Sequence, residues 1–258
     1  MVQVRDISLR EKQHPLIRQL ANAIEDSWRS QLVTSAYDTP TDLGYIEGTL
    51  EGERLTIENH CYQSVQFRKL HLELAKVGSN LDILHCVMFP HTNFHLPIFG
   101  VDIVVAREKV SAAIVDLSPV SPNHELPTEY NSALSKLPLS EFVQPRTLPA
   151  WGDIFSDFCL FVRPTSSQEE IAFLTQAIQY LTIHCQLARE AVPIDSLVEQ
   201  NHIIGGQRQY CSQQQKNDKT RRILENAFGS EWAERYLKTM LFDAVDDHSS
   251  KKSLMTKI

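Results

Sequence analysis

The chain has 258 residues, 42% hydrophobic and 22% charged, so it is long and apolar enough to bury a core and is not a disordered protein. Its formal net charge of −7 argues against a general nucleic-acid binder, which needs a basic surface to contact phosphates. No apolar run reaches the roughly 18 residues of a membrane span, and the first residues carry Asp6 and Glu11 in place of an export signal. We therefore expect a soluble, cytoplasmic protein.

Cysteines and glycines exclude several common cofactor sites. The five cysteines are far apart and form no Cys-x-x-Cys pair for zinc, iron–sulfur or redox chemistry. The nine glycines form neither a dinucleotide-binding motif nor a P-loop. The Gly205-Gly206 pair indicates a loop or a helix break.

The first half of the chain predicts a helix followed by a meander of strands. Residues 15–32 are expected to be helical, because Pro15 suits a first helical turn and apolar residues follow at every fourth position. From about residue 44 to 117 the pattern is typical of strands, beginning with a hairpin that turns at 51–53. Further strands are expected at 67–78, 81–90, 97–107 and 109–118. The connections are too short for crossover helices, so the sheet should be antiparallel.

The second half predicts a proline-rich connection and then mainly helices. Residues 118–150 should contain one short helix near 129–137, and 159–164 a last strand. Helices are expected at 167–191, 207–228 and 230–245. No linker divides the chain, so we expect one domain over 1–258, with flexible ends at about 1–12 and 246–258. Helices from both halves should cover the two faces of the sheet.

Ionisable side chains interrupt three neighbouring predicted strands. His71 and Glu73 share one face of the strand at 67–78, while His85 and Asp102 each interrupt an apolar strand. Any one of them could be a polar core residue with a hydrogen-bond partner. Together, because unpaired buried charges are costly, they favour an acid/base pocket. A His/carboxylate metal site is the alternative that the spacing leaves open.

The region 207–228 carries a second polar pattern. Tyr210, Gln214 and Asp218 stand four residues apart, so one stripe of the expected helix is polar, which fits either a solvated face or the lining of a site. Basic residues gather in the same region and could meet an anionic ligand or an acidic protein: Lys216, Lys219, Arg221 and Arg222. Arg146, close to Trp151, is another candidate to bind an anion.

Several long segments resemble one known family, the ferredoxin-dependent bilin reductases. They include LGYIEGTLEGERLTIENHCYQSVQFRKLHLELAKVGSNLDILHCVMFP, VSAAIVDLSP, WGDIFSDFCLFVRP and QQQKNDKTRRILENAFGSEWAERY, and the resemblance covers most of residues 15–245. It implies an α/β/α sandwich with biliverdin IXα held between the sheet and the C-terminal helices. The branch it resembles reduces biliverdin by four electrons to phycocyanobilin through 18¹,18²-dihydrobiliverdin and bilin radicals. Electrons come singly from reduced [2Fe-2S] ferredoxin, and no metal or flavin is bound.

The resemblance also implies roles for particular residues. Glu73 would protonate the D-ring vinyl group, while His85 and Asp102 would pass protons to the tetrapyrrole centre and the A ring. The supporting proton network and the residues in contact with the bilin would be His71, Asn217, Asp218, Ser111, Arg146, Tyr210, Gln214, Lys219 and Ile223. Arg146 and Lys219 resemble the residues that hold the propionates. Ile223 stands where the family often has valine, so it could narrow the pocket.

Two other functions fit the same residues. A bilin or haem carrier would use the pocket without catalysis, and a mononuclear metal oxygenase would use the two histidines and two carboxylates as ligands. For the reductase, an acidic ferredoxin should dock on a basic patch drawn from Lys216, Arg221, Arg222, Lys69 and Arg68. No apolar stripe predicts an oligomer, so we expect a monomer.

Overall fold

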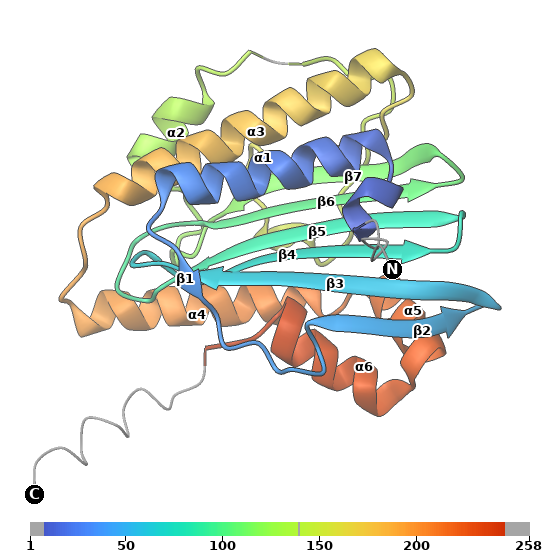
Figure 1. Cartoon of the computed structure of the whole chain (residues 1–258). Helices are drawn as coiled ribbons and strands as arrows, with labels where there is room; N and C mark the ends of the chain where they lie inside the picture. The colour runs from blue at the N-terminus through green and yellow to red at the C-terminus, as the bar shows by residue number, and fades with distance from the viewer. Residues whose placement is uncertain (1–7, 139, 246–258) are drawn as a thin grey trace, which may run out of the picture.

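The computed structural model describes residues 8–138 and 140–245, in which an antiparallel sheet lies between two helical layers (Figure 1). Its strands are β1 Ser35–Ala36, β2 Tyr45–Leu50, β3 Glu53–Gln63, β4 Phe67–Val77, β5 Leu81–Pro90, β6 Ile98–Ala106, β7 Lys109–Ser118 and β8 Leu160–Val162. Their order in the sheet is β1-β3-β4-β5-β6-β7-β8, and β2 pairs with β3 outside that path. The predicted meander is confirmed, because β3 to β7 are neighbours in both sequence and space.

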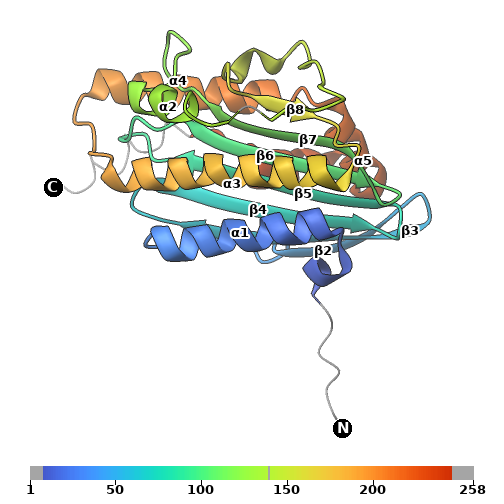
Figure 2. The ribbon, with the colours of Figure 1, turned by 90° about the horizontal axis from the view of Figure 1, so that it is seen from above.

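Helices cover both faces of this sheet. They are α1 Pro15–Gln31, α2 Thr128–Leu134, α3 Ser167–Glu190, α4 Leu197–Gln214, α5 Asp218–Phe228 and α6 Ser230–Tyr236. Shorter turns are η1 Leu9–Lys12, η2 Gly152–Ile154 and the π-helical η3 Leu237–Leu241. Figures 1 and 2 show α1, α2 and α3 on one face and α4, α5 and α6 on the other. The three-layer α/β/α sandwich is therefore confirmed.

The layer formed by α1 and α3 is a dense apolar core. Pro15 begins α1, and the Nδ1 atom of His14 accepts a hydrogen bond from the backbone N–H of Leu16, which caps the helix. The predicted stripe of α1 is buried to its end, where Trp28 is 1% exposed and its indole N–H donates to the sulfur of Met88 on β5. This face of the sheet is thus closed, which leaves the opposite face for a site.

Two predictions for the region 205–228 are wrong, the helix break at Gly205-Gly206 and the continuous helix over 207–228. Gly205 and Gly206 lie inside α4, and a Cβ at Gly206 would stand 2.2 Å from the carbonyl oxygen of Val120, so glycine allows the helix to touch another backbone. The helix then stops at Gln214, and α5 begins at Asp218. Asp218 is therefore not on the same helical stripe as Tyr210 and Gln214.

The chain ends differ from their prediction in part. Residues 9–12 form η1, and Leu9 is buried in the α1 layer, so this stretch is ordered. The expected flexibility of 1–7 and 246–258 concerns positions outside the described residues. Among the helices of the described part, none is long and apolar enough to cross a bilayer.

Candidate functional site

A row of polar side chains crosses the sheet on the face covered by the C-terminal helices. Asn59 on β3 pairs in register with Glu73 on β4, Glu73 with His85 on β5, and His85 with Asp102 on β6. Residues in register across antiparallel strands stand side by side, about 5 Å apart. His71 lies two residues before Glu73 and so faces the same way. We call Asn59, Glu73, His85 and Asp102 the polar row.

His85 and Asp102 form a hydrogen-bonded ion pair. The Nδ1 atom of His85 lies 2.6 Å from Oδ1 of Asp102, so the imidazole donates through Nδ1. Burial by itself lowers the pKa of His85, but the carboxylate of Asp102, through charge and hydrogen bond, outweighs burial and raises this pKa. The histidine side chain is 9% exposed and that of Asp102 is 41% exposed. The pair therefore holds a proton at the border between the interior and solvent.

Glu73 is the buried acid of the row. Its Oε2 atom accepts a hydrogen bond from the hydroxyl of Tyr236 at 2.5 Å, and that hydroxyl also lies 3.0 Å from Oδ1 of Asn59. Burial raises the pKa of Glu73, although the neighbouring His85 and the bond from Tyr236 oppose the change. A carboxyl with a raised pKa can be a general acid near neutral pH.

His71 completes the buried group. Its Nε2 atom is 2.7 Å from Oδ1 of Asn59 and therefore donates to it. Its ring stands edge-on to that of His85, with centroids 5.9 Å apart. Burial lowers the pKa of His71 well below its usual value, with further lowering from Lys69 and His85, so this ring is neutral. Nε2 of His85 and Nδ1 of His71 have no hydrogen-bond partner within the described chain, which leaves them for a ligand or water.

Asn59 of the row and two residues near it, Tyr236 and Lys69, were not predicted from the sequence to belong to the acid/base pocket. Asn59 and Tyr236 each stand in an ordinary amphipathic segment, so no pattern marked them. Lys69 alternates with His71 and Glu73 on one face of β4, a signal that was present in the sequence. Burial lowers the pKa of Lys69, which is 0% exposed.

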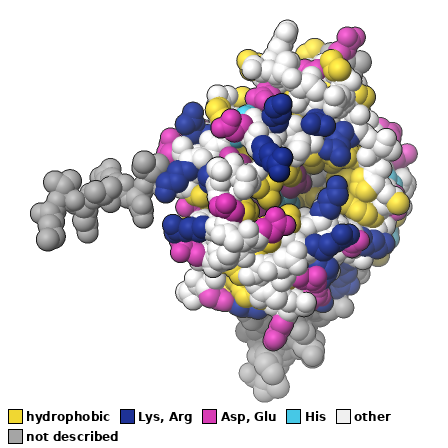
Figure 3. Space-filling model, turned by 90° about the vertical axis from the view of Figure 1, so that its right-hand side faces the viewer, with side chains coloured by type: hydrophobic (Ala, Val, Ile, Leu, Met, Phe, Trp, Pro, Cys, Tyr) yellow, Lys and Arg dark blue, Asp and Glu magenta, His cyan; other side chains and the backbone are white. Residues whose placement is uncertain are grey.

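The site face is open beside Asp102. Along β6 and β7, the partly exposed residues Asp102, Val104 and Ile114 face the site, whereas the alternate residues that face α3 are buried. Figure 3 shows a hollow with hydrophobic side chains and with Lys and Arg side chains around it, on the side where the β4–β5 and β6–β7 turns lie. An apolar cleft with a basic rim suits a large flat ligand that carries anionic groups.

Four of the predicted substrate contacts form two pairs. Nη1 of Arg146 donates to the carbonyl oxygen of Ser111 at 2.6 Å, which places both beside the irregularity that shifts the register between β6 and β7. The hydroxyl of Tyr210 accepts from Nε2 of Gln214 at 3.1 Å. A Cβ at Gly100 would lie 3.1 Å from that hydroxyl, so Tyr210 reaches the sheet next to Asp102 because position 100 is glycine.

The remaining predicted residues lie around the start of α5. Asn217 caps this helix, since its side chain accepts from the backbone N–H of Lys219. The Asp218 side chain is 74% exposed and points its carboxylate to Arg222, which stands on the same helix. Lys219 is exposed and Ile223 is half-buried.

The basic docking patch expected from sequence is only partly available. Lys69 is fully buried and Arg68 pairs with Asp243, so neither can be a docking contact. Nη1 of Arg221 lies 2.6 Å from the carboxylate of Glu234. Lys216 and Arg222 are exposed and remain candidates.

A second buried carboxylate, Asp116 on β7, binds the loop that contains Ser156 to the sheet. Asp116 accepts hydrogen bonds from the hydroxyls of Ser118 and Ser156, both at 2.6 Å, and from the backbone N–H of Ser156 at 3.1 Å. Burial raises the pKa of Asp116 to about 6, although these bonds oppose the change. Asp153, in the same loop as Ser156, accepts from Gln213 on α4 at 3.0 Å. The loop is thus fastened to both the sheet and α4.

In the ranges 8–138 and 140–245, no three His, Cys, Asp or Glu side chains form a group that could hold a metal ion. All five cysteines are free thiols.

Comparisons with known proteins give the family. The family described as ferredoxin-dependent bilin reductase matches residues 21–243. A phycocyanobilin:ferredoxin oxidoreductase from a Synechococcus species is 56% identical over 242 residues, which are 93% of this chain and 98% of that protein. The corresponding protein from Trichodesmium erythraeum is 56% identical over 233 residues, 90% of this chain and 95% of that protein.

A solved structure shares the fold at low identity. Phytochromobilin synthase from tomato, in complex with biliverdin, superposes with a TM-score of 0.72 at 16% identity, covering 88% of this chain and 83% of that one. The family match and the two cyanobacterial relatives extend over nearly the whole chain. The chain therefore belongs to the ferredoxin-dependent bilin reductase family.

Proposed function

We propose that this bilin reductase converts biliverdin IXα to phycocyanobilin, with four electrons from reduced [2Fe-2S] ferredoxin and four protons, in the cytoplasm and as a monomer. The observation that carries the proposal is the polar row, which sets a buried acid and a charged His–Asp pair side by side next to an open apolar cleft. The relatives named phycocyanobilin:ferredoxin oxidoreductase support the choice of product.

The buried acid of the row and its His–Asp pair suit two different reductions. Burial raises the pKa of Glu73 and so favours its neutral form, which would give a proton to the D-ring vinyl group in the first two-electron step. That step gives 18¹,18²-dihydrobiliverdin. His85 and Asp102 share a proton, and Asp102 is partly exposed beside the cleft. This position fits protonation of the tetrapyrrole centre and then of the A ring. Each electron that arrives singly leaves a bilin radical until the next one follows.

The remaining site residues would hold the bilin. Arg146 and Lys219 are exposed cations near the cleft and would bind the propionates, while Ser111, Tyr210, Gln214 and Ile223 would contact the rings. His71, Asn217 and Asp218 would support the proton network, His71 through Asn59. We propose no bound metal or flavin, because ferredoxin supplies the electrons directly.

The assay uses purified chain, biliverdin and regenerated reduced ferredoxin without oxygen, followed by visible absorbance and chromatography of the pigment. We expect transient radical bands and phycocyanobilin as the product. Glu73→Gln should bind biliverdin but lose reduction of the D-ring vinyl group, because the amide cannot donate the acidic proton. Glu129→Gln on α2, at an exposed position on the other side of the sheet, is the matched control and should react like the wild type.

A carrier would give a different result in the same assay. Biliverdin would bind in a one-to-one ratio and leave unchanged, and this outcome would refute the reductase proposal.

Ferredoxin docking is tested separately. We propose that ferredoxin docks on exposed basic side chains, with Lys216 and Arg222 among the contacts. Lys216→Glu and Arg222→Glu should raise the KM for ferredoxin and make turnover less sensitive to salt. Arg29→Glu on α1, another exposed position, is the control. If Lys216→Glu and Arg222→Glu have the same KM for ferredoxin as the control, ferredoxin docks elsewhere.

A further inference from the structure

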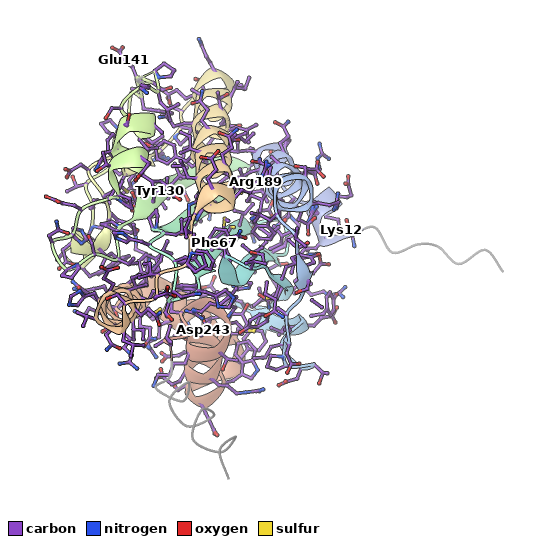
Figure 4. The ribbon with its side chains drawn as sticks, turned by 90° about the vertical axis from the view of Figure 1, so that its left-hand side faces the viewer. Lys12, Phe67, Tyr130, Glu141, Arg189 and Asp243 are labelled. Atoms are coloured by element: carbon purple, nitrogen blue, oxygen red, sulfur yellow. The ribbon has the colours of Figure 1, made fainter. Side chains whose placement is uncertain are left out.

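The segment Leu237–Asp243, which we call the C-terminal strap, is fastened to the start of β4. The ammonium group of Lys69 donates to the carbonyl oxygens of Thr239 at 2.9 Å and Met240 at 2.7 Å. Arg68 donates to the Asp243 carboxylate at 3.0 Å and to its backbone carbonyl at 2.9 Å. Figure 4 shows Phe67, where β4 begins, and Asp243 at the same end of the molecule.

These contacts are unusual enough to need an explanation. A lysine is almost never fully buried unless it is paired, and Lys69 is 0% exposed. It stands on the same face of β4 as His71 and Glu73, so a buried cation has been placed in the site layer to bind two backbone carbonyls. Residues Leu237–Leu241 of the strap form a π-helical turn, a form that is rare and is often found at functional sites.

The strap places the ring of Phe242 against the ring of His85. The two rings meet edge to face with centroids 5.7 Å apart, and Phe242 is 5% exposed. Phe242 also lines a hollow of about 620 Å³ together with Tyr37, Gln215 and Asp243. Phe242 thus contacts both that hollow and His85, whose Nε2 atom is buried without a partner among the described residues.

We propose that Phe242 is a positioning residue that keeps water in this hollow away from His85, and that Lys69 and Arg68 hold it in place through the strap. A buried ring N–H without a protein partner takes up water that can reach it. Water at this point would screen the His85–Asp102 pair and would compete with the bilin for the proton. This last consequence rests on the proposed function, whereas the exclusion of water does not.

The first experiment therefore uses the protein without substrate. Exchange of the His85 ring N–H protons with water is measured by NMR in the wild type, Phe242→Ala and Phe242→Leu. We expect exchange to accelerate about tenfold or more in Phe242→Ala and to return close to the wild-type rate with leucine, which restores an apolar wall. Wild-type exchange in Phe242→Ala would overturn the proposal.

His184 provides an internal control for general loosening. It is buried on the opposite face of the sheet, where its Nδ1 atom lies 2.9 Å from the hydroxyl of Tyr130. Its ring N–H exchange should be the same in every variant. An equal acceleration at His184 and His85 would show that the variant is loosened throughout and would contradict a local wall.

The fastening is tested with Lys69→Met and Lys69→Arg. Methionine fills similar space but cannot donate to the carbonyls of Thr239 and Met240, so His85 exchange should accelerate although Phe242 is intact. Arginine keeps the donors and should restore slow exchange. If Lys69→Met does not fold, Arg68→Gln tests the same fastening at Asp243. Slow exchange in the folded variant would show that Lys69 does not hold the wall.

Turnover then tests the consequence for catalysis. In Phe242→Ala we expect kcat to fall about tenfold and the KM for biliverdin to change less than about threefold, with a changed pH profile of kcat. A purely structural role would lower stability and leave the pH profile unchanged. If the wild type itself does not reduce biliverdin, the proposed function fails, and the exchange result still decides whether Phe242 excludes water.

Discussion

Replacing Asp116 by asparagine should change how the stability of the protein depends on pH. Burial raises the pKa of Asp116 from its ordinary 3.8 to about 6, so the folded protein keeps a proton there that the unfolded chain has lost. The contribution is fully present below the unfolded pKa and is lost as pH rises through the folded pKa. The difference between the two pKa values corresponds to about 3 kcal/mol in the free energy of unfolding.

The assay is urea unfolding of the wild type and Asp116→Asn between about pH 4 and about pH 7. Asparagine is neutral throughout, and its amide can still bind Ser118 and Ser156, so the difference between the two proteins isolates the carboxyl group. The variant should gain roughly 2 to 3 kcal/mol relative to the wild type as pH rises over this range. Parallel stability curves would refute the reasoning, because they would mean that the Asp116 pKa is the same folded and unfolded.

Other substitutions test the site and the packing of α4. Tyr236→Phe removes a hydrogen bond that favours the charged form of Glu73, so the pKa of Glu73 should rise further and D-ring reduction should persist to higher pH in a pH–rate profile. Gly206→Ala should lower the free energy of unfolding by about 1–3 kcal/mol, because its Cβ would meet the Val120 carbonyl at 2.2 Å. Gly205→Ala, with no atom within 4 Å, should instead stabilise α4 by about 1 kcal/mol, and loss of stability in this control would show that the contact at Gly206 is not the cause.

Alternation and short connections were enough to predict the sheet. The strands predicted at 81–90 and 109–118 have the same bounds in the structure, because each is an apolar run closed by a turn. Since alternation also fixes which side chains share a face, it placed His71 with Glu73. The contact between His85 and Asp102 required the register of β5 with β6, which the sequence does not give directly.

The helical layer on the site face was harder to predict. The break between Gln214 and Asp218 follows a run of glutamines that is compatible with a continuous helix, so periodicity did not reveal it. Gly206 looked like a helix break because its actual role, close approach to the backbone of Val120, depends on a segment 86 residues away in the sequence, from 120 to 206. Tyr236 and Phe242 reach the site only because the last helices fold back over the sheet, which local patterns do not record.

The order of groups along the polar row gives the proposed proton delivery a direction. Glu73 is buried, which favours the neutral acid, whereas Asp102 has 41% of its side chain exposed to solvent. His85 stands between them in register with both. Solvent protons can therefore enter at Asp102 and be held on His85, while Glu73 keeps its own proton until the substrate needs it. Such an arrangement works only if water does not also reach His85 from the helix side, which is the role that the geometry gives to Phe242.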